Sequence, residues 1–309
     1  MMINKFFSAA LALALVFSLA ACSSDSSQET STEDPTKTPT TQPAPTTKPH
    51  EQPKFQEAVL VDSDDLLFKI TAVTDDPIWG YTLKAHMENR TDKDLMFSLD
   101  AVSVNGFMCD PFFAATVTAG MKANKDISFS KDDFKAIGIK AVTDVTFTLK
   151  VYDSQDITDD PVLEEEFIIY PMGKENAREY PRQEQEGDIV LFENEDCAMI
   201  ITGFETGYIW GFQAQVYLVN RTDDTLMFSV GDAALNGFMC DPFFAQSVAP
   251  GKQCITDISW TKDALEENGI KMVTSMTLPI RVYDAENWLE EAIINETFTV
   301  NLEKIPTSR

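Results

Sequence analysis

The sequence Asn105-Gly106-Phe107-Met108-Cys109-Asp110-Pro111-Phe112-Phe113-Ala114 occurs twice in this chain. The second copy, identical at every position, lies 131 residues further on as Asn236-Gly237-Phe238-Met239-Cys240-Asp241-Pro242-Phe243-Phe244-Ala245. The same displacement aligns Trp79-Gly80 with Trp210-Gly211, Asn89-Arg90-Thr91-Asp92 with Asn220-Arg221-Thr222-Asp223, and Val151-Tyr152-Asp153 with Val282-Tyr283-Asp284. No gap is needed across this span, so the sequence predicts two tandem copies of one domain.

The chain has 309 residues, which is long enough for two domains that each bury a core. We expect domains at 55–171 and 188–305, joined by a polar linker at 172–187. Short alternating segments dominate both copies, for example Tyr81, Leu83, Ala85 and Met87 with polar residues between them. This pattern predicts an all-β fold of two immunoglobulin-like antiparallel β-sandwiches. A jelly roll or a small barrel is the alternative, since periodicity does not separate these topologies.

Local signals set the ends of several elements. Asn-Arg-Thr-Asp supplies turn chemistry in both copies. Ser130 and Gly138 have the places of the N-cap and the C-terminal glycine of a short helix, and Thr261 and Gly269 match them in the second copy. Pro279 falls on the outward face of a long strand, which predicts a free side there.

The N-terminal residues have the pattern of an export signal. Lys5 provides a short positive region, residues 6–19 are apolar, and Leu19-Ala20-Ala21-Cys22 ends the segment. The apolar run is too short for a comfortable membrane span. The pattern resembles the lipobox of bacterial lipoproteins, which implies a signal peptide at 1–21 and a diacylglycerol thioether on Cys22. An ordinary secretory signal cut near Ala21 is the alternative.

Residues 22–54 are rich in Ser, Thr and Pro, with Ala44 as the one aliphatic residue after Cys22. Such a segment buries too little apolar surface to offset the entropy of ordering it. We therefore predict a lipidated, disordered tether that holds the folded part away from the membrane. O-glycosylation or binding by this stalk is a further possibility.

The quoted motifs resemble the immunoglobulin-like domains of uncharacterised lipoproteins from Gram-positive bacteria. The resemblance is carried by Asn-Arg-Thr-Asp, Leu-Met-Phe-Ser, the Asn-Gly-Phe stretch and the Ala-Gly or Pro-Gly turn before an Ile-Ser strand. It covers both copies. It implies a sandwich fold and a surface location, and it implies no activity.

Charge and residue inventory exclude several functions. A net charge of −26 argues against nucleic acid as a partner, because phosphate binding relies on Lys and Arg. The two histidines are His50, in the tether, and His86, on a polar strand face, so a Cys109–His86 dyad is disfavoured. We expect no enzyme, no cofactor and no metal. Acidic runs at 62–65 and 156–160 suggest calcium, but neither fits the twelve-residue calcium loop.

The second copy has Cys197 and Cys254 where the first has Leu66 and Ala123. Both positions have the parity of inward-facing residues, so we predict a disulfide specific to the second domain, stable outside the cell. Cys109 and Cys240 lack such a partner within their own copy and are expected to be buried thiols.

Two interpretations of the decapeptide remain open. Its aromatic residues could plug the sandwich core, or they could form an exposed patch that binds a bivalent ligand. The candidate binding residues are Trp79, Phe107, Phe112, Phe113, Trp210, Phe238, Phe243 and Phe244. The sequence thus predicts a membrane-anchored lipoprotein on the extracytoplasmic face that binds an unknown extracellular or envelope protein or glycan. An envelope spacer, a protease inhibitor and a hydrolase are the alternatives.

Overall fold

The computed structural model describes residues 55–76, 80–156, 158–178, 180–207 and 211–307. The predicted signal peptide, the tether with Cys22, Trp79 and Trp210 lie outside these residues. The described residues belong to one compact unit. No helix in the described ranges has the length and apolar character that a membrane crossing needs.

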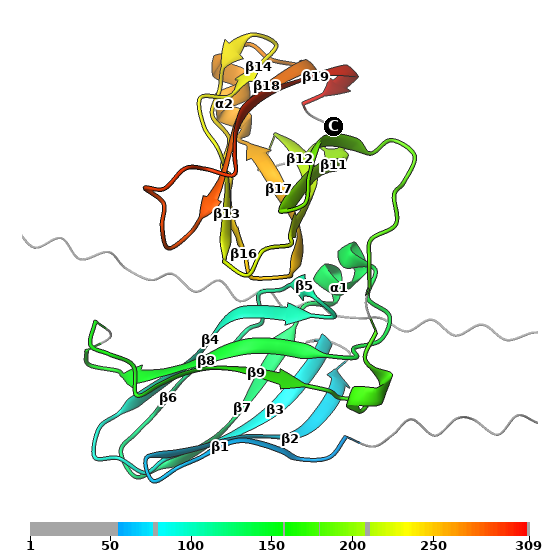
Figure 1. Cartoon of the computed structure of the whole chain (residues 1–309). Helices are drawn as coiled ribbons and strands as arrows, with labels where there is room; N and C mark the ends of the chain where they lie inside the picture. Colours follow the sequence, from blue (N-terminus) through cyan, green and yellow to red (C-terminus); the bar gives the residue numbers. More distant parts are fainter. Residues whose placement is uncertain (1–54, 77–79, 157, 179, 208–210, 308–309) are drawn as a thin grey trace, which may run out of the picture. The chain divides into compact units, whose positions relative to one another are not determined.

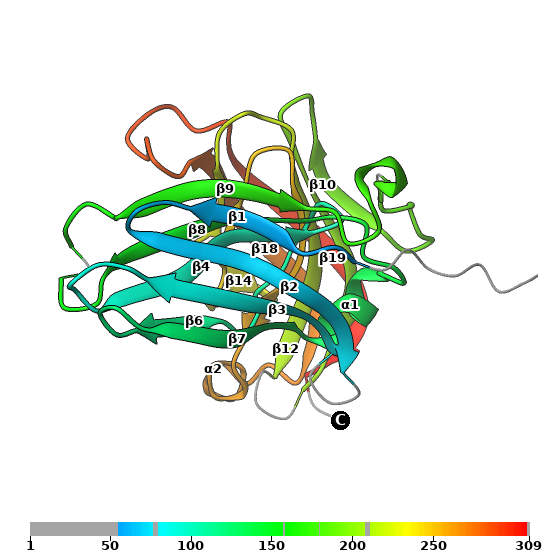
Figure 2. The same cartoon turned by 90° about the horizontal axis from the view of Figure 1, so that it is seen from below.

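The first repeat forms two antiparallel sheets (Figures 1 and 2). Its elements are β1 (Ala58–Asp62), β2 (Leu66–Asp76), β3 (Gly80–Asn89), β4 (Leu95–Val104), β5 (Phe107–Met108), β6 (Ala114–Val117), β7 (Lys122–Phe129), α1 (Lys131–Ile137), β8 (Val145–Asp153) and β9 (Leu163–Ile169). One sheet has the order β1-β2-β3-β7. In the other, β4 pairs with β5, β6 and β8, and β8 pairs with β9. The chain changes sheet after β3, after β6 and after β7, as in immunoglobulin-like sandwiches.

The second repeat repeats this arrangement. After the short helix η1 (Lys174–Asn176) come β10 (Ile189–Glu193), β11 (Cys197–Glu205), β12 (Phe212–Asn220), β13 (Leu226–Val230), β14 (Ala234–Leu235), β15 (Phe238–Met239), β16 (Ala245–Val248), β17 (Gln253–Trp260), α2 (Lys262–Glu267), β18 (Met272–Asp284) and β19 (Ile294–Pro306). One sheet contains β10-β11-β12-β17 and continues into the β4 sheet of the first repeat, because β17 pairs in parallel with β5. The other is built on β18, which pairs with β13, β14 and β19. The predicted all-β sandwich fold is confirmed.

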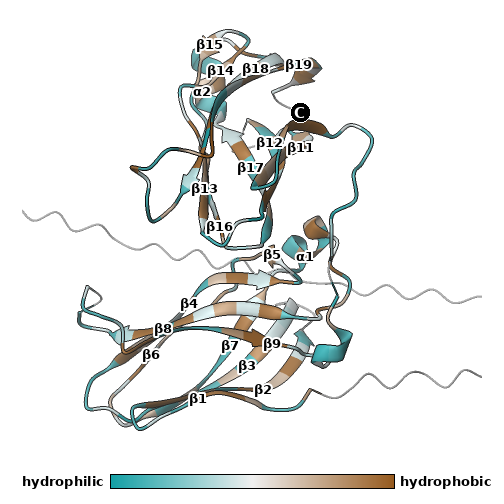
Figure 3. Cartoon of the chain, in the orientation of Figure 1, coloured by the Kyte–Doolittle hydropathy of each residue, from teal (hydrophilic) through white to brown (hydrophobic). Residues whose placement is uncertain are grey.

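Alternating residues fill a hydrophobic core in each repeat, and Figure 3 shows apolar and polar segments alternating along the strands. In the first repeat, the ring of Phe68 lies 6.2 Å from that of Phe97 and 6.5 Å from that of Phe147, which joins the two sheets. In the second, Phe212 lies 5.5 Å from Trp260. Burial of such rings is the main stabilising contribution of each sandwich.

The predicted helix caps at Ser130, Gly138 and Thr261 are confirmed, and a tight turn begins the decapeptide. Asn105 and Gly106 have φ of 51° and 81°, the geometry of a type I′ hairpin turn between β4 and β5. The Ser130 hydroxyl accepts hydrogen bonds from backbone N–H groups of the first turn of α1, and Gly138 ends the helix with φ of 82°. Thr261 caps the start of α2 in the same way, but the cap at the end of α2 is Asn268, one residue before Gly269.

The prediction of a free side at Pro279 is wrong for the strand as a whole. β18 lies between β19 and the pair β13 and β14. Pro279 falls where this neighbouring strand is interrupted between β13 and β14, and its carbonyl accepts a hydrogen bond from the Gly231 N–H at 3.3 Å. In the first repeat Thr148 has this place and β4 continues past it. Proline therefore interrupts the ladder locally without marking a sheet edge.

Candidate binding surface of the repeated decapeptide

Hydrogen bonds hold the decapeptide at both ends. The Asn105 side-chain amide donates to the carbonyl of Ala141 at 2.7 Å, and its oxygen accepts from the N–H of Thr143 at 2.8 Å. At the other end, the Phe112 N–H donates to the carbonyl of Ser128 at 2.8 Å, and the Phe112 carbonyl accepts in return. The segment therefore leaves the sheet of β4 and is attached to β7 in the opposite sheet.

The second copy is held by equivalent bonds. Asn236 donates to the carbonyl of Met272 at 2.6 Å and accepts from the N–H of Thr274 at 2.8 Å. The Phe243 N–H donates to the carbonyl of Ser259 at 2.8 Å. The same backbone path thus appears twice.

Adjacent phenylalanines in this path point in opposite directions. The side chain of Phe112 is 88% exposed, whereas Phe113 packs against the core with its ring 6.4 Å from that of Phe68. Phe243 is 65% exposed, and Phe244 packs against the second core. Phe113 and Phe244 therefore belong to the core, as the first interpretation has it, whereas Phe112 and Phe243 are exposed on the surface.

The first phenylalanine of the decapeptide differs between the copies. Phe107 is 3% exposed, and its ring lies 6.5 Å from that of Tyr217. The N–H of Gln253 in β17 donates to the carbonyl of Gly106 at 3.0 Å beside this contact. Phe238, the equivalent of Phe107, is 52% exposed. Phe107 is therefore not available as a binding residue.

The residue types on the outer strand faces account for this difference. Ile200, Tyr217, Val219 and Ile255 of the second repeat cluster with Phe107. Their equivalents in the first repeat are Lys69, His86, Glu88 and Asn124. An apolar outer face is stabilised when another element covers it, whereas a charged face stays hydrated. The sequence analysis did not predict this contact, although polar or charged residues of the first repeat are replaced by more apolar residues at the equivalent positions of the second.

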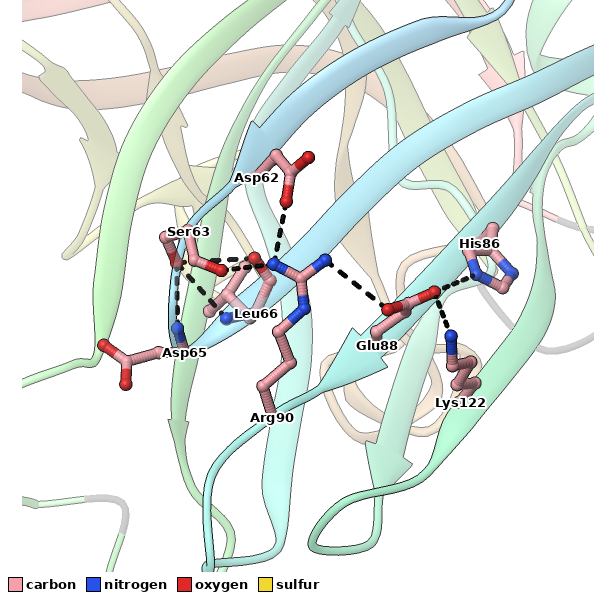
Figure 4. A network of polar contacts seen from close by, with 8 residues as sticks. All are labelled: Asp62, Ser63, Asp65, Leu66, His86, Glu88, Arg90 and Lys122. Carbon is pink, nitrogen blue, oxygen red and sulfur yellow. Dashed lines mark hydrogen bonds and ion pairs between the residues drawn. The ribbon is translucent and has the colours of Figure 1, made fainter.

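The charged outer face of the first repeat forms the ion-pair network of Figure 4. Glu88 accepts hydrogen bonds from Lys122 at 2.6 Å and from His86 at 3.2 Å, and Arg90 donates to Asp62 at 2.7 Å. The hydrogen bond from Lys122 is the main reason that the pKa of Glu88 is lowered to about 2. Asp62, in the acidic run considered for calcium, is thus paired with a cation.

In the described ranges, no group of three or more His, Cys, Asp or Glu side chains lies close enough to hold a metal ion. His86 is engaged by Asn124 through Nδ1 at 2.7 Å and by Glu88 through Nε2. Its ring nitrogens are therefore directed to the network on the outer face, while Cys109 belongs to the core.

The predicted disulfide is wrong: Cys197 and Cys254 are free thiols in the structure. Both are buried, as the parity predicted. However, β12 lies between their strands, with Cys197 opposite Asn220 and Cys254 opposite Leu218. Two inter-strand steps separate strands by about 10 Å, which exceeds the roughly 7 Å between Cα atoms that a disulfide allows. The alternation along a strand predicts the face on which a residue lies, but it does not predict the order of the strands in the sheet.

The buried thiols should be chemically inert. Burial raises the pKa of Cys109 and of Cys254 to about 12 and that of Cys197 to about 11. Because the thiolate is the reactive form, we expect iodoacetamide at pH 8 to label these residues at least about 100-fold more slowly in the native chain than in urea. Mass spectrometry of alkylated peptides measures this ratio. Equal labelling of native and unfolded protein would contradict it.

The same pKa shifts set a pH dependence of stability. The folded state keeps these thiols protonated up to about pH 11 or 12, whereas unfolded thiols ionise near 9.0. Their contribution to the free energy of unfolding is therefore complete below pH 9 and is lost as the pH rises towards 12.

No protein-family model and no curated protein matches the sequence. Among solved structures, the YadV chaperone aligns with 11% identity and a TM-score of 0.21 over 77% of this chain and all of that chain. Red sea bream transglutaminase aligns with 10% identity and a TM-score of 0.21 over 79% of this chain and 32% of that chain. At these TM-scores neither likeness carries an argument about fold or function.

Proposed function

We propose that the chain is a non-catalytic binding module, anchored by a lipid on Cys22 to the extracytoplasmic face of the membrane. Phe112 and Phe243 bind a protein or glycan of the cell envelope. One observation carries the proposal: an exposed phenylalanine is presented twice, from the same backbone path, in two copies of one sandwich.

The exposure of these two rings is maintained by the framework. The neighbours Phe113 and Phe244 anchor the segment in the core, and backbone hydrogen bonds to Ser128 and Ser259 fix its direction. A ring on a fixed segment has little conformational entropy to lose when a partner covers it. Aromatic side chains also contribute a large share of the binding energy at protein interfaces.

Duplication and the tether support the same function. Two equal sites on one chain allow a repetitive ligand to be bound with an avidity that exceeds the affinity of either site by about 10²–10⁴. The Ser/Thr/Pro-rich residues 22–54 have the composition of a spacer between the lipid and the sandwiches. A polymer or an array of proteins in the envelope would present such repeated ligands.

The test is capture from envelope extract and spent medium of the producing cells with the full chain as bait. We expect a saturable protein or glycan that is retained by the wild type and lost from a chain with Phe112→Ser and Phe243→Ser. The matched control carries Val59→Ser and Val190→Ser, which alter another duplicated and exposed apolar pair, each 54% exposed.

Equal retention by the phenylalanine variant and the valine control would show that the decapeptide is not the site. If the folded wild type retained nothing, the binding function would be rejected in favour of the envelope spacer. Inhibition or turnover by the bait would identify the inhibitor or the hydrolase instead.

A further inference from the structure

A cavity of about 920 Å³ opens beside α1 in the first repeat, away from the decapeptide phenylalanines. Val73, Tyr81, Phe134, Ile139 and Val142 supply much of its apolar lining. Its volume falls in the range of sites that hold small molecules, roughly 300–1,000 Å³. The ring of Phe134 lies 6.1 Å from that of Tyr81, so part of the wall is aromatic.

Two positions in the wall of this cavity have other residues in the second repeat. The equivalent of Val73 is Phe204, whose ring stacks on that of Phe212 at 5.8 Å. Helix α2 buries Leu265, the equivalent of Phe134, whereas α1 buries none of its residues. The second repeat thus has a larger side chain at the position of Val73, and its helix buries a residue where α1 buries none.

The cavity also carries positive charge in a chain whose net charge is −26. Lys131, Lys135 and Lys140 line it, and Asp75 is 3.8 Å from the ammonium group of Lys131. No ion pair joins Lys135 or Lys140 to a carboxylate among the described residues. At the position of Lys135 the second repeat has Glu266. Lys131 and Lys140 have the equivalents Lys262 and Lys271 in the second repeat. Lys135 is therefore the lysine of the three that the second repeat lacks.

We propose that this cavity binds a single-chain organic anion, independently of the binding surface on the decapeptide. The apolar chain of the ligand lies against Val73 and Phe134, and its carboxylate is held by Lys135 and Lys140. Apolar walls with a few convergent charged groups are the usual composition of such sites. Among the described residues no carboxylate pairs with these two ammonium groups, and they provide the charge-assisted hydrogen bonds for the anion.

The proposal is tested by isothermal titration calorimetry of the full chain with decanoate and, as a probe of the same length and opposite charge, decylammonium. Both are used below the concentrations at which they form micelles. We expect one decanoate per chain and at least tenfold weaker binding of decylammonium, against the overall charge of the protein. Val73→Phe, which introduces the residue type of the second repeat, should abolish binding of decanoate.

Lys135→Glu with Lys140→Glu should weaken decanoate binding at least about tenfold, since both charged partners are lost. Lys125→Glu, an exposed residue on β7 that does not line the cavity, is the matched control and should bind as the wild type does. Unfolding in urea checks that each variant is folded. Absence of binding, equal affinity for the two probes, or unchanged affinity in the lysine variant would overturn the proposal.

Discussion

A chain with both Phe112→Ser and Phe243→Ser should lose retention on the captured envelope ligand, while each single substitution should weaken it by about 100-fold or more. The reason is that one intact site still binds, but without the second attachment that produces avidity. Each lost ring also removes an aromatic contact of the kind that contributes about 2–4 kcal/mol at an interface. Surface plasmon resonance over the immobilised ligand, at two ligand densities, measures these effects.

The density of the immobilised ligand distinguishes avidity from the affinity of a single site. At low ligand density the wild type should approach the two single variants, because two attachments to neighbouring ligands become rare. The control with Val59→Ser and Val190→Ser should follow the wild type at both densities. If one single variant already abolished binding and the other had no effect, only one repeat would bind and the bivalent mechanism would be wrong.

Asn89→Ala and Asn220→Ala should each lower the free energy of unfolding by about 2–4 kcal/mol. The Asn89 amide donates to the carbonyls of Lys93 at 2.7 Å and of Val117 at 2.8 Å, and its oxygen accepts from the N–H of Thr91 at 3.0 Å. Truncation leaves a buried carbonyl without a donor. Asn220 makes the same set of bonds in the second repeat.

Urea unfolding followed by circular dichroism provides the test, with Asp92→Ala and Asp223→Ala as controls in the same exposed turns. Asn89→Asp should be worse than Asn89→Ala, because a carboxylate would face two carbonyl oxygens. A change in the free energy of unfolding below about 0.5 kcal/mol for Asn89→Ala is the size usual for surface substitutions. It would show that the hydrogen bonds of the Asn89 side chain do not stabilise this turn.

Local chemistry made much of the fold predictable. The Asn-Gly turn requires positive φ at both residues, and Ser130 and Thr261 satisfy helix N–H groups within three residues. Such features depend on neighbours in the sequence. Pro279 shows where prediction from local chemistry ends. A proline lacks a backbone donor, but its place in the sheet depends on the interruption between β13 and β14.

The candidate site was only half predictable. Two adjacent phenylalanines must point to opposite faces of an extended segment, but which one points inward depends on the attachment of Phe112 to Ser128 in another sheet. The free Cys197 and Cys254 have the same cause, since the order β11-β12-β17 arises from contacts distant in sequence. The alternation of apolar and polar residues within a strand does not predict which distant strand it pairs with.

The measurement that tests the central claim most directly is the urea unfolding of the chain with Phe112→Ser and Phe243→Ser. If these rings belong to the surface, the free energy of unfolding should stay within about 0.5 kcal/mol of the wild type, as for other exposed positions. A loss of about 3 kcal/mol or more, typical of the truncation of a buried phenylalanine, would place both rings in the core and contradict the proposed binding surface.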